Sequence, residues 1–239
     1  MSNEQVAATS AGVNMMDVLM VSYMSAKPPV PQTKDNTALL LIDIQHLAEP
    51  SHLAQKAIAA GLDEAAVFVA LEDYSARFNA ALANCQKILN AAREFGIVPI
   101  HIKIQSLSKT ARDTGALHRR MGWTFAPGDA ATAFLDPTKP LHDEIVITKT
   151  ASGAFTGTAL ENTLKNMGIE YLVICGFVTD ECVETTARTA LDLGFIVKII
   201  EDGTTTYFAE SYLAAIGKFA SLGFTIATDA AIDLFSTLN

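Results

Sequence analysis

The sequence predicts an α/β fold with a doubly wound, mainly parallel sheet of about six strands and helices on both faces. Three observations carry this prediction. Short apolar runs rich in Val, Ile and Leu alternate along the chain with segments of helical periodicity. The runs do not alternate between polar and apolar residues, which is typical of parallel strands that are covered on both faces. Several helical segments also close with glycine, the common stop of a helix.

Each element follows from one of these patterns. Strands are expected at five apolar runs and at a shorter sixth, namely Thr37–Asp43, Ile97–Ile104, Glu144–Lys149, Tyr171–Gly176, Phe195–Glu201 and Phe224–Ala227. Helices are expected at Leu71–Phe95, Gly157–Met167, Thr179–Leu193 and Glu210–Leu222. Glycine follows or ends the helical pattern at Gly96, Gly168, Gly194 and Gly223.

Three segments stand outside this alternation. Residues 1–36 are expected to form an N-terminal arm with one short helix near Asn14–Met24, as a partly ordered tail or packed on a neighbouring subunit, and residues 37–239 a single domain. The Ala-rich segment His46–Ala70 is expected to be helical in part. The segment Gln105–Leu141 contains three prolines, and a loop of this length is usually a lid or a binding loop.

Composition excludes several classes of protein. The 239 residues carry a net charge of −9 and their Lys and Arg residues are scattered, which disfavours a nucleic-acid or anionic-membrane surface. Three cysteines, an odd number, do not form a secreted disulfide framework. No apolar run approaches the ~18 residues of a membrane span, and the polar N-terminus lacks a signal-peptide pattern. We expect a cytoplasmic protein with no membrane partner.

Chemically capable side chains stand where strands end. Asp43 ends the first apolar run, Lys149 ends the third, and Cys182 follows the fourth. Ligands of open α/β sheets bind beyond the carboxyl ends of the strands. We therefore expect an acid, a base and a thiol at one rim, although each residue taken alone also suits a turn or a solvated surface.

Cys182 is expected in the first turn of a helix. Unpaired backbone N–H groups and the positive end of the helix dipole lie there, and both favour a thiolate. The neighbouring Asp180 and Glu181 oppose this effect by repelling a negative sulfur. The alternative is a buried structural cysteine, which is how Cys85, within a helix, and Cys175, within a strand, are interpreted.

Three sequence blocks resemble the isochorismatase-like cysteine hydrolase superfamily. They are Leu-Leu-Ile-Asp43-Ile-Gln, Lys149-Thr-Ala-Ser-Gly-Ala-Phe155, and the run from Cys175 to Ala187 that contains Thr179-Asp-Glu-Cys182-Val. The resemblance covers roughly Asn36 to Leu234. It implies a Rossmann-like three-layer sandwich, a catalytic triad of Asp43, Lys149 and Cys182, and a cis peptide bond at Val178–Thr179.

The resemblance is greatest to the branch that hydrolyses ureido, carbamoyl and small amide substrates. It implies an attack by Cys182 on a carbonyl carbon, with the oxyanion held by the backbone N–H groups of Thr179 and Cys182. Relatives with a metal site carry an Asp-x-His pair, which this chain lacks. We expect no metal and no other cofactor, and a structural role for His46, His52, His101, His118 and His142.

Residues of the long loop or after strand ends are candidates for substrate binding. They are Gln105, Trp123, Phe155, Tyr207 and Arg119, the last with its neighbour Arg120. Packing is the alternative role for the aromatic residues, and a solvated surface is the alternative for the arginines. The expected partners are a small-molecule substrate and, as implied by the resemblance, further copies of the chain in a dimer or tetramer.

Other functions remain open from the sequence. A vinyl-ether hydrolase of the same superfamily uses its Asp as an acid and does not depend on the cysteine. A non-catalytic relative would use the same fold for binding or assembly. A flavodoxin-like nucleotide binder would show the same alternation of strands and helices, but no Gly-x-Gly-x-x-Gly or Walker-type loop follows any strand.

Overall fold

The computed structural model describes residues 13–15, 17–18 and 30–239. The chain divides into two compact units, Met1–Pro31 and Gln32–Asn239. In the first unit, the side chains of Asn14 and Asp17 accept hydrogen bonds from each other's backbone N–H groups at 3.0 Å. Residues 16 and 19–24 of the helix expected at Asn14–Met24 lie outside the described residues.

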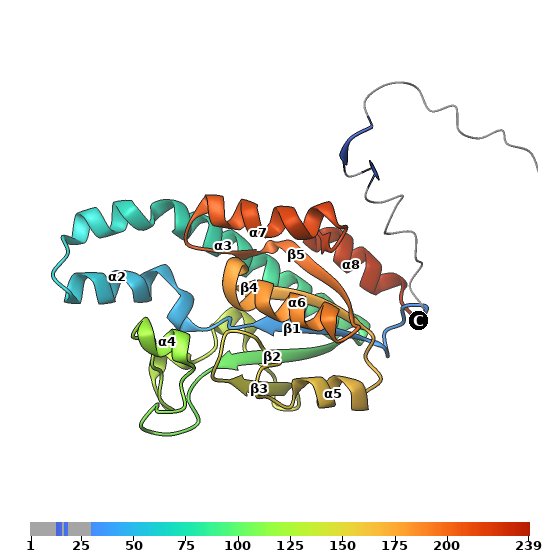
Figure 1. The fold of residues 1–239 in the computed structure, drawn as a ribbon, viewed down its shortest axis with the longest axis horizontal. Helices are drawn as coiled ribbons and strands as arrows, with labels where there is room; N and C mark the ends of the chain where they lie inside the picture. The colour runs from blue at the N-terminus through green and yellow to red at the C-terminus, as the bar shows by residue number, and fades with distance from the viewer. Residues whose placement is uncertain (1–12, 16, 19–29) are drawn as a thin grey trace, which may run out of the picture. The chain divides into compact units, whose positions relative to one another are not determined.

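The second unit is built on a six-stranded sheet in which every pairing is parallel (Figure 1). Its strands, in chain order, are β1 (Thr37–Ile42), β2 (Val98–Ile104), β3 (Ile145–Lys149), β4 (Tyr171–Phe177), β5 (Ile196–Thr205) and β6 (Thr225–Ile226). In space they are ordered β3-β2-β1-β4-β5-β6. The predicted parallel sheet of about six strands is confirmed. Its order reverses between β1 and β4, and this is the switch point at which doubly wound sheets bind ligands.

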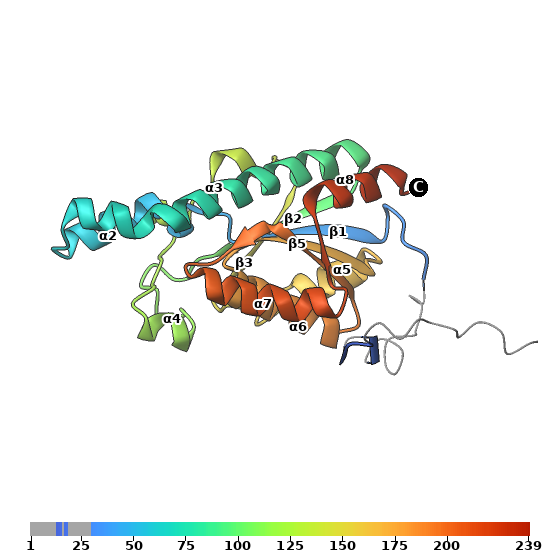
Figure 2. The ribbon, with the colours of Figure 1, turned by 90° about the horizontal axis from the view of Figure 1, so that it is seen from above.

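Helices cover both faces of the sheet, as Figure 2 shows. One face carries α3 (Glu64–Phe95) and α8 (Thr228–Thr237), and the other carries α5 (Leu160–Asn166), α6 (Glu184–Asp192) and α7 (Ala209–Ser221). Successive residues of β1 supply the two cores in turn: Leu39 and Leu41 face α3, whereas Leu40 and Ile42 face α6. The predicted three-layer arrangement follows from this period of two.

Some element boundaries differ from the prediction. Helix α3 begins at Glu64, before the expected Leu71, because the Asp63 side chain caps it by accepting a hydrogen bond from the Ala66 N–H at 2.9 Å. It ends where expected, at Gly96 with φ 77°. Strand β5 continues past Glu201 to Thr205, and α8 was not anticipated. The Ala-rich segment contains α2 (Pro50–Ala59), which together with the start of α3 projects beyond the sheet (Figure 1).

The segment between β2 and β3 is a long loop, as expected, and it contains short helices that were not. These are α4 (Ala116–Arg120), η2 (Ala130–Thr132) and η3 (Asp136–Thr138), and a further one, η1 (His46–Ala48), follows β1. The buried side chain of Gln45 ties the loop to the strand ends. It donates to the carbonyls of Ile104 at 3.2 Å and Thr132 at 2.6 Å and accepts from the Ile104 N–H at 2.8 Å. One edge of the loop is thereby fixed at the ends of β1 and β2.

Glu144 joins this loop to α3 and β2 through a buried carboxylate. Arg93 donates to both of its oxygens at 2.7 and 2.9 Å, and the His101 ring lies 2.9 Å away. Burial opposes ionisation, but the hydrogen bonds from Arg93 and the Leu141 N–H hold the pKa of Glu144 at about 2. A carboxyl with a depressed pKa stabilises the fold above its unfolded-state pKa and loses this effect as the pH falls towards its folded value.

Glu144→Gln is therefore expected to lower the free energy of unfolding by about 2–3 kcal/mol at pH 7. The loss should shrink as the pH falls from about 4.5 towards about 2. Urea unfolding at pH 7 and pH 3 measures both values, with Asp143→Asn, at an exposed neighbouring carboxylate, as the matched control. An equal loss at both pH values would contradict the assignment.

Candidate active site

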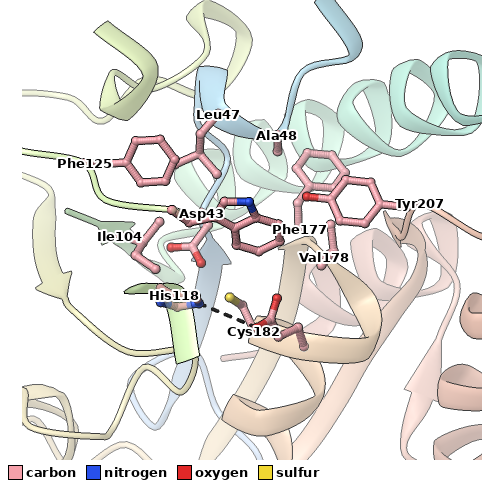
Figure 3. Close-up of a pocket in the computed structure, with 12 residues that line it drawn as sticks. Asp43, Leu47, Ala48, Ile104, His118, Phe125, Phe177, Val178, Cys182 and Tyr207 are labelled. Carbon is pink, nitrogen blue, oxygen red and sulfur yellow. Dashed lines mark ion pairs between the residues drawn. The ribbon is translucent and has the colours of Figure 1, made fainter. Parts of the chain in front are cut away.

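A pocket opens at the switch point of the sheet, beyond the carboxyl ends of β1, β2 and β4 (Figure 3). It contains about 400 Å³ of empty space, counting its open mouth. Its lining is mostly apolar and aromatic and consists of Asp43, Leu47, Ala48, Ile104, His118, Trp123, Phe125, Phe177, Val178, Glu181, Cys182 and Tyr207. An apolar pocket with a few convergent polar groups is typical of a small-molecule site.

The three residues predicted at the strand ends meet at the floor of this pocket. The Lys149 Nζ lies 2.7 Å from the Asp43 Oδ2 and 3.4 Å from the Cys182 Sγ, and it donates to the Ala151 carbonyl at 3.0 Å. Lys149 starts on β3, which is separated from β1 by β2, so its long side chain passes the end of β2. Figure 3 shows the Asp43 carboxylate and the Cys182 sulfur on facing sides of the pocket.

Asp43 is placed by a tight turn at the end of β1. Its φ of 47° lies in the left-handed region, which Asp tolerates better than most residues. Its N–H donates to the Ile102 carbonyl at 3.0 Å, and its carbonyl accepts from the Gln45 N–H at 2.8 Å. The Asp43 Oδ2 forms an ion pair with the Lys149 Nζ, but the two groups are not aligned for a hydrogen bond. The Asp43 Oδ1 has no hydrogen-bond partner among the described residues. One carboxylate oxygen is thus left to exchange a proton.

Glycine is required directly beneath the site. Gly176, in β4, has φ 120°, and a Cβ at this position would lie 2.1 Å from the Ile42 carbonyl oxygen. Only a residue without a side chain allows β4 to approach β1 this closely. The approach brings the residues after β4 near the residue after β1.

Cys182 lies in a single π-helical turn, η4 (Thr179–Val183), which leads into α6. Burial raises the pKa of the Cys182 thiol far above its ordinary range, Lys149 counteracts this in part, and Asp43 adds to the rise. The expected effect of the helix end on the thiol is therefore opposed by the loss of solvent around the sulfur. Burial thus favours the neutral thiol over the thiolate.

The two partners of the thiol form a buried charged pair. Burial raises the pKa of Asp43 above its usual range, although Lys149 works in the opposite direction, so this carboxylate is a stronger base than an exposed one. Burial alone would lower the pKa of Lys149, but the charge of Asp43 and the nearby Cys182 raise it. The lysine remains an ammonium beside the carboxylate.

The cis peptide bond lies one position earlier than predicted, at Phe177–Val178 and not at Val178–Thr179. Strand β4 extends to Phe177, so the chain changes direction directly after its last residue. Thr179 is already the first residue of the π-helical turn, and its hydroxyl lies 2.8 Å from the hydroxyl of Thr204.

Two of the five predicted substrate-binding residues line the pocket, namely Trp123 and Tyr207. Gln105 does not: its amide donates to the Thr132 hydroxyl at 2.8 Å, and it lines a smaller neighbouring cavity. Phe155 packs against Phe195 on the α5–α6 face, with ring centroids 5.9 Å apart. These two assignments are corrected, because strand-end position alone does not determine where a side chain points.

Arg119 is also not part of the pocket. Its side chain is exposed and donates to the Arg112 carbonyl at 3.1 Å, and Arg120 is exposed as well. The short helix α4 turns a different residue, His118, towards the site. The arginine pair therefore belongs to the solvated surface, which was the alternative interpretation.

A histidine–glutamate pair was missed by the sequence analysis. His118, expected to be structural, lines the pocket with its Nε2 3.6 Å from the Glu181 Oε1, and its ring stacks on Trp123 at 6.0 Å. The Ser152 hydroxyl lies 3.2 Å from the same Glu181 oxygen and 3.3 Å from the His118 Nε2. The only available signal was the position of Glu181 directly before Cys182.

The remaining histidines and cysteines lie away from this pocket. His101 contacts Glu144, and Cys85 and Cys175 are buried free thiols. Within the described part of the chain, no three His, Cys, Asp or Glu side chains are grouped so that they could hold a metal ion. In the same residues, no helix is long and apolar enough to cross a membrane.

The chain matches the protein-family model described as "Isochorismatase domain" over residues 37–231. It belongs to the isochorismatase family, a family of hydrolases. Over 124 residues it is 36% identical to the uncharacterized isochorismatase family protein YrdC of Bacillus subtilis (strain 168), a match that covers 52% of this chain and 60% of YrdC. Over 222 residues it is 24% identical to the ureidoacrylate amidohydrolase RutB of Pseudomonas savastanoi pv. phaseolicola (strain 1448A / Race 6), covering 83% of this chain and 82% of RutB. The chain thus spans less than two thirds of YrdC.

Solved structures confirm the fold class. A cysteine hydrolase from Pseudomonas syringae pv. phaseolicola 1448A has a TM-score of 0.70 at 19% identity, covering 89% of this chain and 99% of that chain. N-carbamoylsarcosine amidase from Thermoplasma acidophilum has a TM-score of 0.60 at 18% identity, covering 81% of this chain and 97% of that chain.

Proposed function

We propose that this protein is a metal-independent cysteine hydrolase that cleaves an amide, ureido or carbamoyl C–N bond of a small molecule through a thioester on Cys182. The observation that carries the proposal is the position of the Lys149 ammonium, 2.7 Å from the Asp43 carboxylate and 3.4 Å from the Cys182 sulfur. The similarity to RutB and the fold shared with N-carbamoylsarcosine amidase support this class of reaction.

The first half of the reaction forms the thioester. The Cys182 sulfur attacks the substrate carbonyl carbon while its proton passes to Asp43, whose buried carboxylate is a strengthened base. Lys149 stabilises the negative charge that is shared between sulfur and carboxylate during this transfer. When the tetrahedral intermediate collapses, the C–N bond breaks, Asp43 returns the proton to nitrogen, and ammonia or an amine leaves.

The second half hydrolyses the thioester. Water attacks the acyl carbon as Asp43 takes one of its protons, the C–S bond breaks, and the proton returns to the sulfur. We place the oxyanion of both tetrahedral intermediates at the backbone N–H groups of Thr179 and Cys182. Both residues belong to η4, directly beside the sulfur, where backbone N–H groups can meet a developing oxyanion.

A screen of primary amides, ureido acids and carbamoyl compounds for ammonia release tests this function. We expect turnover of at least one class, and we expect EDTA to leave the rate unchanged, because the chain lacks the Asp-x-His pair of metal-dependent relatives. Loss of turnover in EDTA with recovery on adding Zn²⁺ would contradict the metal-independent mechanism. If none of these classes of compound releases ammonia, the proposed C–N hydrolysis is wrong.

We also propose that the chain forms a homo-oligomer in the cytoplasm, with residues 1–36 as an arm and residues 37–239 as the hydrolase domain. The unit boundary at Pro31 supports this division. Large apolar side chains left exposed on the second unit, such as Phe68, Phe208 and Leu213, support association. Light scattering on the full chain would give a monomer mass if the association is wrong.

A further inference from the structure

The pocket contains negative charge and lacks a cationic wall. Two of its lining residues, Asp43 and Glu181, are carboxylates, and none of the described residues that line it is Lys or Arg. Lys149 is only 1% exposed and is already engaged with Asp43, Cys182 and the Ala151 carbonyl. Its charge offsets that of Asp43. Among the described residues that line the pocket, no lysine or arginine then balances the charge of Glu181.

Glu181 is held in its ionised form. The His118 ring and the Ser152 hydroxyl lie beside its Oε1. The hydrogen bond with His118 lowers the pKa of Glu181 more than burial raises it. The carboxylate is therefore a fixed acceptor next to the residue that carries the sulfur.

His118 orients the Glu181 carboxylate. Its Nε2 lies 3.6 Å from the Glu181 Oε1 and 3.3 Å from the Ser152 hydroxyl oxygen. Its Nδ1 is buried and has no hydrogen-bond partner among the described residues. The part of this pair that a ligand can reach is therefore the Glu181 carboxylate, whose side chain is 22% exposed.

Two arginines that contact or adjoin lining residues are unavailable. Arg77 donates to the Thr205 hydroxyl at 2.7 Å and to the carbonyls of Thr206 and Tyr207 at 2.6 and 3.1 Å. Arg119 is exposed and does not line the pocket. A substrate carboxylate would therefore enter without the paired charge that carboxylate recognition ordinarily uses.

We propose that Glu181, supported by His118, makes this pocket selective for uncharged amides and ureas whose N–H groups it accepts, and against substrates that carry a carboxylate. This inference rests on the proposed C–N hydrolysis and specifies its substrate class. The pocket then discriminates by repulsion as well as by attraction, because the carboxylate of an anionic substrate would lose its solvent next to the Glu181 carboxylate.

Selective alkylation of Cys182 tests the proposal without requiring any substrate. Iodoacetamide and iodoacetate have nearly the same shape and differ in charge, and in both the sulfur displaces iodide from carbon. The rates at the Cys182 peptide are measured by mass spectrometry at pH 8. The ratio of the two rates is compared with the same ratio for glutathione.

We expect the ratio of iodoacetamide to iodoacetate reactivity to exceed that of glutathione by about tenfold or more, equivalent to about 1.4 kcal/mol of discrimination. Glu181→Gln should move the ratio most of the way to the glutathione value. Asp180→Asn removes the same charge from the adjacent exposed position, which does not line the pocket, and should leave the ratio nearly unchanged. This matched control separates the local carboxylate from general charge.

A ratio equal to that of glutathione, or one that Glu181→Gln and Asp180→Asn change equally, would overturn the proposal. If the raised pKa of the Cys182 thiol slows alkylation by both reagents below detection, the ammonia assay decides. Ammonia release from butyramide and from its anionic counterpart succinamate gives a second readout. A preference for succinamate would refute the selectivity but leave C–N hydrolysis intact, whereas a selective alkylation ratio without any ammonia would refute the hydrolysis alone.

Discussion

Replacing Cys182 with serine is expected to lower the rate of ammonia release by about 10⁴-fold or more, because loss of the proposed nucleophile leaves only binding and electrostatic stabilisation. A serine hydroxyl has a much higher pKa than a thiol, and the buried Asp43 would have to take its proton in the same dry site. Steady-state ammonia assays on the best substrate of the screen measure the loss, and unchanged urea unfolding would show that the fold is intact.

The same variant separates the alternatives. Cys85→Ser is the matched control: Cys85 is a buried thiol outside the pocket that donates to the Gly203 carbonyl at 3.0 Å, a bond that a hydroxyl can keep. We expect this control to retain activity. A Cys182→Ser enzyme as fast as the wild type would favour the vinyl-ether type of chemistry, in which Asp43 is an acid. A wild-type chain inactive on all substrates would favour the non-catalytic relative.

Replacing Lys149 with methionine is expected to lower the free energy of unfolding by about 3–5 kcal/mol, because it leaves the Asp43 charge buried without its partner. Lys149 and Asp43 are 1% and 2% exposed, and their charged atoms lie 2.7 Å apart. The variant should also lose ammonia release, since nothing then stabilises the charge passed between Cys182 and Asp43. Urea unfolding and the ammonia assay measure the two effects.

A double variant, Asp43→Asn with Lys149→Met, is the control for this prediction. Replacing both charges removes the unpaired carboxylate, so we expect most of the lost stability to return while activity stays absent. A free energy of unfolding for Lys149→Met within about 1 kcal/mol of the wild-type value would contradict this prediction. It would mean that the buried Asp43 charge does not depend on Lys149 for its stabilisation.

The fold was predictable because the parallel strands are buried on both faces and therefore appear as uninterrupted apolar runs. Leu39, Leu40 and Leu41 illustrate this, since successive residues serve opposite cores. The meeting of Asp43, Lys149 and Cys182 was predictable for a related reason: parallel strands deliver their following residues to one rim. This prediction did not require the order of the strands in the sheet, because the Lys149 side chain extends past β2 to Asp43.

Features that depend on loop packing and depth of burial were not predictable. No periodic pattern in the sequence indicates which side of α4 faces the pocket, or that His118 contacts Glu181. The sequence therefore pointed to the arginines of that helix, which are exposed. The effect of burial on the pKa of Cys182 was not predictable for the same reason. Sequence shows that a thiol follows a strand near a helix start, but its exclusion from water arises from residues far away in the chain.

Mass spectrometry of enzyme quenched in acid during a single turnover tests the central claim most directly, because the thioester survives acid. We predict that the first equivalent of ammonia appears together with an enzyme species heavier by the acyl group, and that this mass maps to the peptide containing Cys182. An equivalent of ammonia released while that peptide keeps its unmodified mass, or an acyl group found on another peptide, would contradict the account.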